Sequence, residues 1–242
     1  NRCLVGSEMC IRDSLTSLDI TQNPNLEKLN CRYNQISNID LSQNTALSTL
    51  NLSDNNFSSI NITQNTGLEQ LSCEDNLLTS LDVSNNTSLR YFICGDNQLT
   101  NLDISANPAL TYLGCHANQL TSLDVSNNTA LEVLSFGKNQ LSVIDVSNNT
   151  SLNEIRCYEN QLTSLDLSSN TNLTKIDLSY NPLTCLNLKN GFNTNIVVFN
   201  SKKNPNLNCI EVDNPSWSTS NWLDVDSNLN FSTNCSYPAG CF

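Results

Sequence analysis

A motif that returns every 21 residues constrains this chain more than any other sequence feature. Its best-defined copy is residues 110–129, LTYLGCHANQLTSLDVSNNT. Counted from Leu120 in steps of 21 residues, the same position holds Leu15, Ile36, Phe57, Leu78, Leu99, Leu141, Leu162 and Leu183. A fixed period of this size is typical of a solenoid, in which each coil buries its apolar face against its neighbours. We therefore expect one elongated repeat domain.

Each coil consists of two halves with similar spacing. In the copy that starts at Leu110 the first half reads LxxLxCxxN and the second reads LxxLDVxxN. Apolar residues at a spacing of two predict a short strand with one face inward in each half. The second half is rich in Ser, Asn and β-branched residues, which are unfavourable inside helices. The pattern thus predicts strands on both sides of the coil.

Two rows of asparagines mark the corners between the halves. The first row is Asn34, Asn55, Asn76, Asn97, Asn118, Asn139, Asn160 and Asn181. The second row is Asn23, Asn44, Asn65, Asn86, Asn107, Asn128, Asn149 and Asn170. An Asn side chain can both donate to carbonyls and accept from N–H groups where a corner removes the backbone partners. We expect both rows to close the corners in this way.

This pattern closely resembles the leucine-rich repeats, in particular the 21-residue nested class (sometimes called the IRREKO type) with the consensus LxxLxLxxNxLxxLDLxxN. The match covers residues 15–188 without an insertion. The resemblance implies a right-handed repeat solenoid, mostly β, with short strands on both sides and a C-terminal cap. Cys replaces Leu in five coils, a variation that resembles bacterial surface proteins of the Bacteroidetes type.

The two ends depart from the period. Residues 1–14 fit the repeat poorly and resemble translated adapter sequence, so we interpret them as an artefact; the alternative is a degenerate first coil. Residues 189–242 resemble the cap that follows such repeats, with Cys209 and Cys235 as the expected disulfide pair. We leave the pairing of Cys3, Cys10, Cys185 and Cys241 open.

The composition excludes some classes of binding partner. The formal net charge is -12 and the pI is near 4.2, which repels nucleic acid and anionic membrane surfaces. No apolar run is long enough to span a bilayer. The chain starts without Met and in mid-pattern, so we treat it as a fragment.

Two further rows permit a structural and a functional interpretation. Cysteines recur at one repeat position, Cys31, Cys73, Cys94, Cys115 and Cys157. We interpret them as small buried apolar residues, and a metal or redox array is the alternative.

Aspartates recur at another repeat position, Asp19, Asp40, Asp82, Asp103, Asp124, Asp145 and Asp166. For these we expect local hydrogen bonds, with shared calcium ions as the alternative.

The outward positions of the first halves, which we call the variable side, differ from coil to coil. Those that follow the Cys, Leu or Phe are Arg32, Ser53, Glu74, Gly95, His116, Gly137, Tyr158 and Ser179. The next positions are Tyr33, Asp54, Asp75, Asp96, Ala117, Lys138, Glu159 and Tyr180. The outward positions of the second halves are monotonous by comparison. Because aromatic residues and arginine are favoured as interface anchors, we predict a binding strip at Tyr91, Tyr112, His116, Arg156, Tyr158 and Glu159; drift on an ordinary solvated surface is the alternative.

These features favour a non-enzymatic recognition or adhesion module, secreted or on a bacterial surface, that binds a protein or glycan. A structural spacer that presents another domain, stabilised by calcium in one variant, is the alternative. His116 is the single histidine and no nucleophile or phosphate-binding motif is visible, so we expect no catalytic residues. We also expect no metal site, no cofactor, no nucleic-acid partner, no membrane insertion and a monomeric state.

Overall fold

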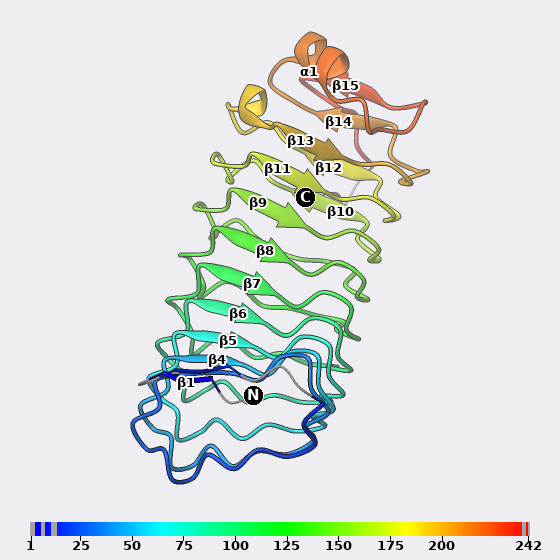
Figure 1. The fold of residues 1–242 in the computed structure, drawn as a ribbon. Coiled ribbons are helices and arrows are strands. Elements are labelled where there is room, and N and C mark those ends of the chain that lie inside the picture. The colour runs from blue at the N-terminus through cyan, green and yellow to red at the C-terminus, as the bar shows by residue number, and fades with distance from the viewer. Residues whose placement is uncertain (1–2, 6–7, 11–13, 239–240, 242) are drawn as a thin grey trace. The chain divides into compact units, whose positions relative to one another are not determined.

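The computed structural model describes the whole chain except residues 1–2, 6–7, 11–13, 239–240 and 242. By its internal packing the chain divides into two compact units, Asn1–Gln119 and Leu120–Phe242. Each unit is a parallel β-solenoid, and we call them the first and the second unit (Figure 1).

The first unit carries one strand per coil on the variable side. The parallel strands are β3 (Lys28–Asn30), β4 (Thr49–Asn51), β5 (Gln70–Ser72), β6 (Tyr91–Ile93) and β7 (Tyr112–Gly114). They pair at the period of the sequence, so that Leu50 lies opposite Leu71 and Leu71 opposite Phe92. This register stacks the inward residues of successive coils into one apolar row.

The N-terminal segment joins the same sheet. Strand β1 (Cys3–Val5) pairs antiparallel with β2 (Glu8–Cys10), and β2 pairs parallel with β3. Met9 lies opposite Leu29, although the 21-residue frame would place Glu8 there. The pairing is therefore shifted by one residue from the 21-residue frame.

The second unit has strands on both sides. Four of them lie on the variable side: β8 (Val133–Ser135), β9 (Glu154–Arg156), β11 (Lys175–Asp177) and β13 (Val198–Asn200). Four others form the second sheet: β10 (Ser164–Asp166), β12 (Cys185–Asn187), β14 (Cys209–Glu211) and β15 (Asn230–Ser232). The described second halves before Ser164 hold no strand, so strands on both sides are found only toward the C-terminus.

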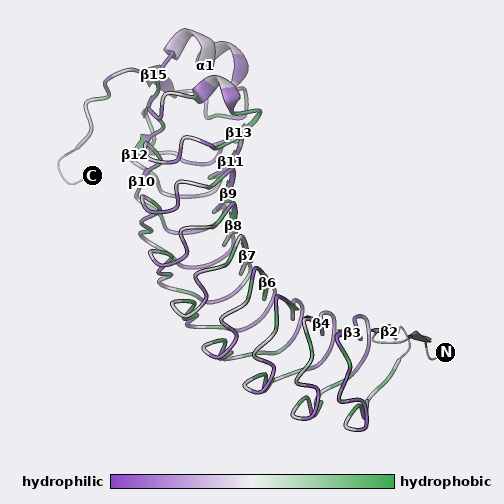
Figure 2. Cartoon of the chain, turned by 90° about the vertical axis from the view of Figure 1, so that its left-hand side faces the viewer, coloured by the Kyte–Doolittle hydropathy of each residue, from purple (hydrophilic) through white to green (hydrophobic). Residues whose placement is uncertain are grey.

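The first row of asparagines has the predicted double function. Asn97 donates to the carbonyls of Cys73, Cys94 and Gly95 at 2.9–3.2 Å, and its Oδ1 accepts from Leu78 N at 2.9 Å. Each such side chain links two coils. The alternation of apolar and polar residues within the coils is visible in Figure 2.

The second row of asparagines differs from the prediction. Asn86 donates to the carbonyls of Ile62 and Asn65 at 3.1 and 2.8 Å. Its buried Oδ1 accepts no hydrogen bond from the described residues, and the same holds for Asn65 and Asn149. The expectation that this row also accepts was wrong, because the turn after each second half already pairs its N–H groups with carbonyls, as in Leu89 N to Asn86 O at 3.1 Å.

The C-terminal region covers the end of the second unit with aromatic side chains. It contains η1 (Asn193–Asn195) and α1 (Pro215–Asn221), and Asn214 caps α1 by accepting from Trp217 N at 3.1 Å. The Trp222 ring stacks on Phe199 at 4.3 Å between centroids. These large side chains close the apolar row that a last coil would otherwise expose.

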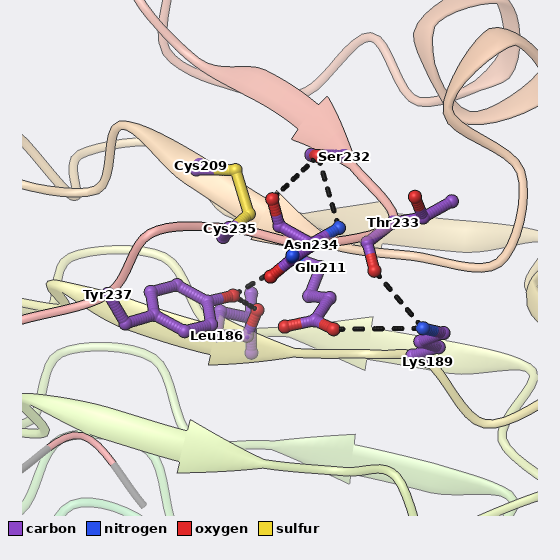
Figure 3. Close-up of a disulfide and its surroundings, with 9 residues drawn as sticks. All are labelled: Leu186, Lys189, Cys209, Glu211, Ser232, Thr233, Asn234, Cys235 and Tyr237. Atoms are coloured by element: carbon purple, nitrogen blue, oxygen red, sulfur yellow. Dashed lines mark hydrogen bonds and ion pairs between the residues drawn. A yellow bond between two sulfur atoms is a disulfide. The ribbon is translucent and has the colours of Figure 1, made fainter.

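Two disulfides fasten the second sheet. One joins Cys209 to Cys235, with Cα atoms 5.9 Å apart, and the other joins Cys185 to Cys241. Near the first, the Tyr237 hydroxyl donates to the Leu186 carbonyl and accepts from Glu211 N (Figure 3). Within the part of the chain that the structure describes, no helix has the length and apolar character needed to cross a bilayer.

Candidate functional site

Two tyrosines form a stacked pair on the variable side of the first unit. Tyr91 begins β6 and Tyr112 begins β7, and the two lie opposite each other in the strand register. Their ring centroids are 4.4 Å apart and the rings are inclined by 26°. Both side chains are half-buried, and burial raises the pKa of Tyr91 above its ordinary value. The two rings therefore pack face to face and leave part of each ring exposed.

A charged cluster lies on the same side. The His116 Nε2 atom is 3.3 Å from Glu74 Oε1 and 3.1 Å from Asp96 Oδ2. Glu74 and His116 occupy the same repeat position two coils apart, with Gly95 between them. A Cβ atom on Gly95 would lie 2.5 Å from His116 Cε1. The missing side chain is therefore what allows the imidazole ring to reach Glu74.

An arginine extends this cluster toward the N-terminus. Arg32 Nε donates to Asp54 Oδ2 at 2.5 Å, and Arg32 Nη2 lies 4.0 Å from Glu74 Oε2. Burial, together with the charges of Asp54 and Asp96, raises the pKa of the Asp75 carboxyl above its usual range. Acidic groups thus outnumber basic ones along this part of the first unit.

The backbone helps to place these carboxylates. The residue before each Asn of the first row has a positive φ, namely Tyr33, Asp54, Asp75, Asp96, Ala117, Lys138, Glu159 and Tyr180, and Lys203, which precedes Asn204, has one as well. At this corner the N–H groups bond to the next coil, as in Asp96 N to His116 O at 2.9 Å. A left-handed residue costs little for Asp and more for larger side chains.

In the second unit, Arg156 and Tyr158 are held by other contacts. Arg156 pairs with the buried Glu154 at 2.5 Å, and Lys175 approaches the same carboxylate at 3.3 Å. The Tyr158 ring lies over Gly137, where a Cβ would be 2.4 Å from Tyr158 Cε1. Glu159 is exposed and has a φ of 51°.

The six residues of the predicted strip therefore fall into two sets. Tyr91, Tyr112 and His116 belong to the first unit, and the other three, Arg156, Tyr158 and Glu159, belong to the second. The sequence prediction omitted Glu74 and Asp96, which the structure joins to His116. Both stand at variable positions, but only the stacking of successive coils shows that they meet His116, from which Asp96 is 20 and Glu74 is 42 residues away in the sequence. Gly95, at a position that carries larger side chains in most coils, is a sequence signal for that contact.

The cysteine and aspartate rows have structural functions. All five row cysteines are buried free thiols, and desolvation raises the pKa of Cys73 to about 12, so that the nucleophilic or metal-binding thiolate is disfavoured. The aspartates accept local hydrogen bonds, as in Ser84 N to Asp82 Oδ1 at 2.9 Å. This is the local arrangement expected from the sequence.

Comparisons with known proteins place the fold among leucine-rich repeat proteins. The functional domain of InlJ from Listeria monocytogenes, which includes a cysteine ladder, is 28% identical, with a TM-score of 0.65 over 85% of this chain and 59% of that one. A leucine-rich repeat protein of Leptospira interrogans is 20% identical, with a TM-score of 0.68 over 91% and 65% of the two chains. YopM, a leucine-rich effector protein from Yersinia pestis, is 21% identical, with a TM-score of 0.68 over 86% and 67%.

Sequence comparisons add little to this result. A family model described as the LVIVD repeat matches residues 133–160, a short stretch that contains β8 and β9. A search of curated proteins finds no match. The chain spans about 59% of the length of the InlJ domain, so that protein's full activity does not transfer to it.

Proposed function

We propose that this chain is a non-enzymatic recognition module that binds a protein or a glycan through its variable side. The stacked pair Tyr91–Tyr112 is the observation on which the proposal rests, because an ordered, half-buried aromatic pair loses little entropy on binding. The parts of the two tyrosine rings that remain exposed can contact either sugar rings or apolar side chains of a protein.

The setting that we propose is extracellular, on or outside a bacterial cell, as a monomer. Two disulfides in the second unit and the likeness to InlJ support this location. We assign the repeats to the 21-residue nested class and retain the resemblance to Bacteroidetes-type surface proteins as part of the proposal. The formal net charge of -12 supports partners other than nucleic acid.

The test compares whole-cell and glycan-array binding of the labelled chain with that of variants. We expect Tyr91→Ala/Tyr112→Ala to lower binding at least tenfold, since hot-spot aromatics contribute about 2 kcal/mol or more each. The matched control is Thr79→Ala/Thr100→Ala, two exposed residues of the second halves in the same unit. Circular dichroism establishes that each variant remains folded.

A second double variant tests the part of the predicted strip that belongs to the second unit. Arg156→Ala/Tyr158→Ala removes two of the three side chains of the predicted strip that belong to the second unit. If binding persists unchanged in both double variants, the recognition proposal fails, and a spacer that presents another domain becomes the better description.

A further inference from the structure

We propose that Glu74, Asp96 and His116 bind a divalent transition-metal ion, with zinc as the ion that best suits this ligand set. The three side chains offer one ligand atom each, and these atoms lie within 4.8 Å of one another. They come from three successive coils of the first unit. The inference does not depend on the recognition proposal, because its readout is metal binding alone.

Two separations between the ligand atoms are close to the edge of a zinc coordination polyhedron. Zinc binds imidazole nitrogen and carboxylate oxygen at about 2.0–2.2 Å, so two ligands at a tetrahedral angle lie about 3.3–3.5 Å apart. The observed separations from His116 Nε2 are 3.3 Å to Glu74 Oε1 and 3.1 Å to Asp96 Oδ2. Small side-chain rotations would bring both oxygens onto one ion.

The charge of the ligand set suits a dication. A divalent ion would neutralise the two carboxylates of Glu74 and Asp96, and an imidazole nitrogen is a common ligand of such an ion. Arg32 Nη2 approaches the other oxygen of Glu74, Oε2, at 4.0 Å. Glu74 Oε1, at 3.3 Å from His116 Nε2, is the oxygen that faces the imidazole. An imidazole ligand favours zinc over calcium or magnesium, which bind oxygen ligands.

The fold constrains the backbone of Asp96 and the ring of His116. Asp96 has a left-handed backbone, with a φ of 47°, between Gly95 and the buried Asn97. The His116 ring lies over Gly95, where a Cβ would be 2.9 Å from Nε2 itself. Side-chain fractional exposures of 25% for His116, 27% for Glu74 and 53% for Asp96 leave the ligand atoms accessible. Three protein ligands leave a fourth position for water or a partner's oxygen.

The experiment titrates zinc into the chelator-stripped chain, prepared without a polyhistidine tag, and follows binding by calorimetry. We expect one zinc per chain. His116→Gln should weaken binding at least tenfold, because even residues that only orient a ligand alter metal affinity by about 10–100-fold. Glu69→Gln, which changes an exposed carboxylate of the same unit, should bind as the unaltered chain does.

A glycine pair separates geometry from ligand chemistry. Gly95→Ala keeps all three ligands but displaces the His116 ring, so we expect it to weaken zinc binding. Gly67→Ala is the matched control, because a Cβ there meets nothing closer than 3.7 Å. Cobalt(II) absorption checks the ligand type: a nitrogen and oxygen site shows no thiolate charge-transfer band, whereas binding by the buried cysteines would.

Three results would overturn the proposal: no saturable zinc binding, a thiolate spectrum, or unchanged affinity in His116→Gln. Circular dichroism of each variant in the absence of metal shows whether a lost affinity reflects unfolding. If His116→Gln unfolds, Gly95→Ala against Gly67→Ala decides, since equal affinities in those two would also contradict the site.

Discussion

At the scale of single residues, the left-handed backbone conformation of the residue before each Asn of the first row is not evident from the sequence. The nine described non-glycine residues with positive φ include Tyr, Lys, Glu and Ala, none of which favours that conformation. Eight of these residues belong to the variable side, and their backbone is held by the hydrogen bonds of the corner, as in Asp96 N to His116 O. The sequence therefore shows a position that varies and does not show that it is strained.

Relief of this strain should stabilise the fold. Ala117 has a φ of 50°, and we expect Ala117→Gly to raise the free energy of unfolding by about 0.5–1 kcal/mol, because glycine adopts positive φ without steric cost. Urea denaturation followed by circular dichroism measures the change. Ala106→Gly is the control: Ala106 has no positive φ, so the added freedom of the unfolded chain should destabilise that variant. Destabilisation by both changes would contradict the argument.

The asparagine rows show how far residue-level prediction extends. Their repetition and the donor and acceptor atoms of the amide were sufficient to predict that they close corners. The sequence could not show that Asn97 uses its Oδ1 while Asn86 does not. That difference depends on which backbone N–H groups at each corner have no backbone carbonyl to bond to. This is decided only when the coils pair.

At the scale of the repeated element, the cysteine row behaves as part of the core. Each row cysteine takes a position that leucine fills in other coils, such as Leu52 and Leu178, and is as completely buried. Desolvation raises the pKa of Cys31 and of Cys115 to about 12. A thiol that seldom ionises and is not exposed to solvent reacts slowly with electrophiles.

We therefore expect the five row cysteines to resist alkylation while the chain is folded. Iodoacetamide at pH 8, followed by peptide mass mapping, should leave Cys31, Cys73, Cys94, Cys115 and Cys157 unmodified under native conditions. The same peptides should be modified fully in denaturant, which is the internal control. Rapid native labelling of any of these five would mean that its coil opens readily or that the thiol is more acidic than burial implies.

The strands show a similar limit at this scale. The period of the apolar residues predicted the strand on the variable side in each coil from Lys28 onward. The same argument predicted strands in every second half, yet described ones begin only at Ser164. Alternating apolar residues specify which side chains point inward, but strand assignment also requires a hydrogen-bonding partner in the neighbouring coil. The second halves satisfy much of their backbone locally, through the Asp hydrogen bond and the turn that follows.

At the scale of the whole molecule, the sequence predicted the class of fold, because 21-residue periodicity leaves few alternatives. It could not predict the candidate metal site, since Glu74, Asp96 and His116 meet only through the stacking of three coils. Negative charge also recurs along the whole molecule, at the position of the aspartate row. The aspartate row contributes much of the net charge of -12, and each member is tied to its own coil by hydrogen bonds.

This row should make stability depend on acid. Hydrogen bonds from the Ser or Thr two residues on lower the pKa of Asp19, Asp40, Asp82, Asp103 and Asp145 below the ordinary 3.8. A pKa lowered in the folded state stabilises the protein above the unfolded pKa, and that stabilisation is lost as the pH falls through the folded pKa. Asp75, whose pKa is raised, changes the pH dependence of stability in the opposite direction. It is a single group, whereas five aspartates of the row have a lowered pKa. We expect the melting temperature to fall as the pH drops from about 4 to about 2.

The triple variant Asp40→Asn/Asp82→Asn/Asp103→Asn isolates this contribution. An amide oxygen can accept the same backbone hydrogen bond, as Asn61 does from Thr63 N at 3.1 Å, but it does not titrate in this range. The variant should therefore remain folded and show a flatter melting curve against pH below about 4. Thermal melts by circular dichroism at steps between pH 5 and pH 2 measure the slope. An unchanged slope would assign the acid sensitivity to other carboxylates, whereas a variant that is unstable at every pH would mean that the row needs charged acceptors.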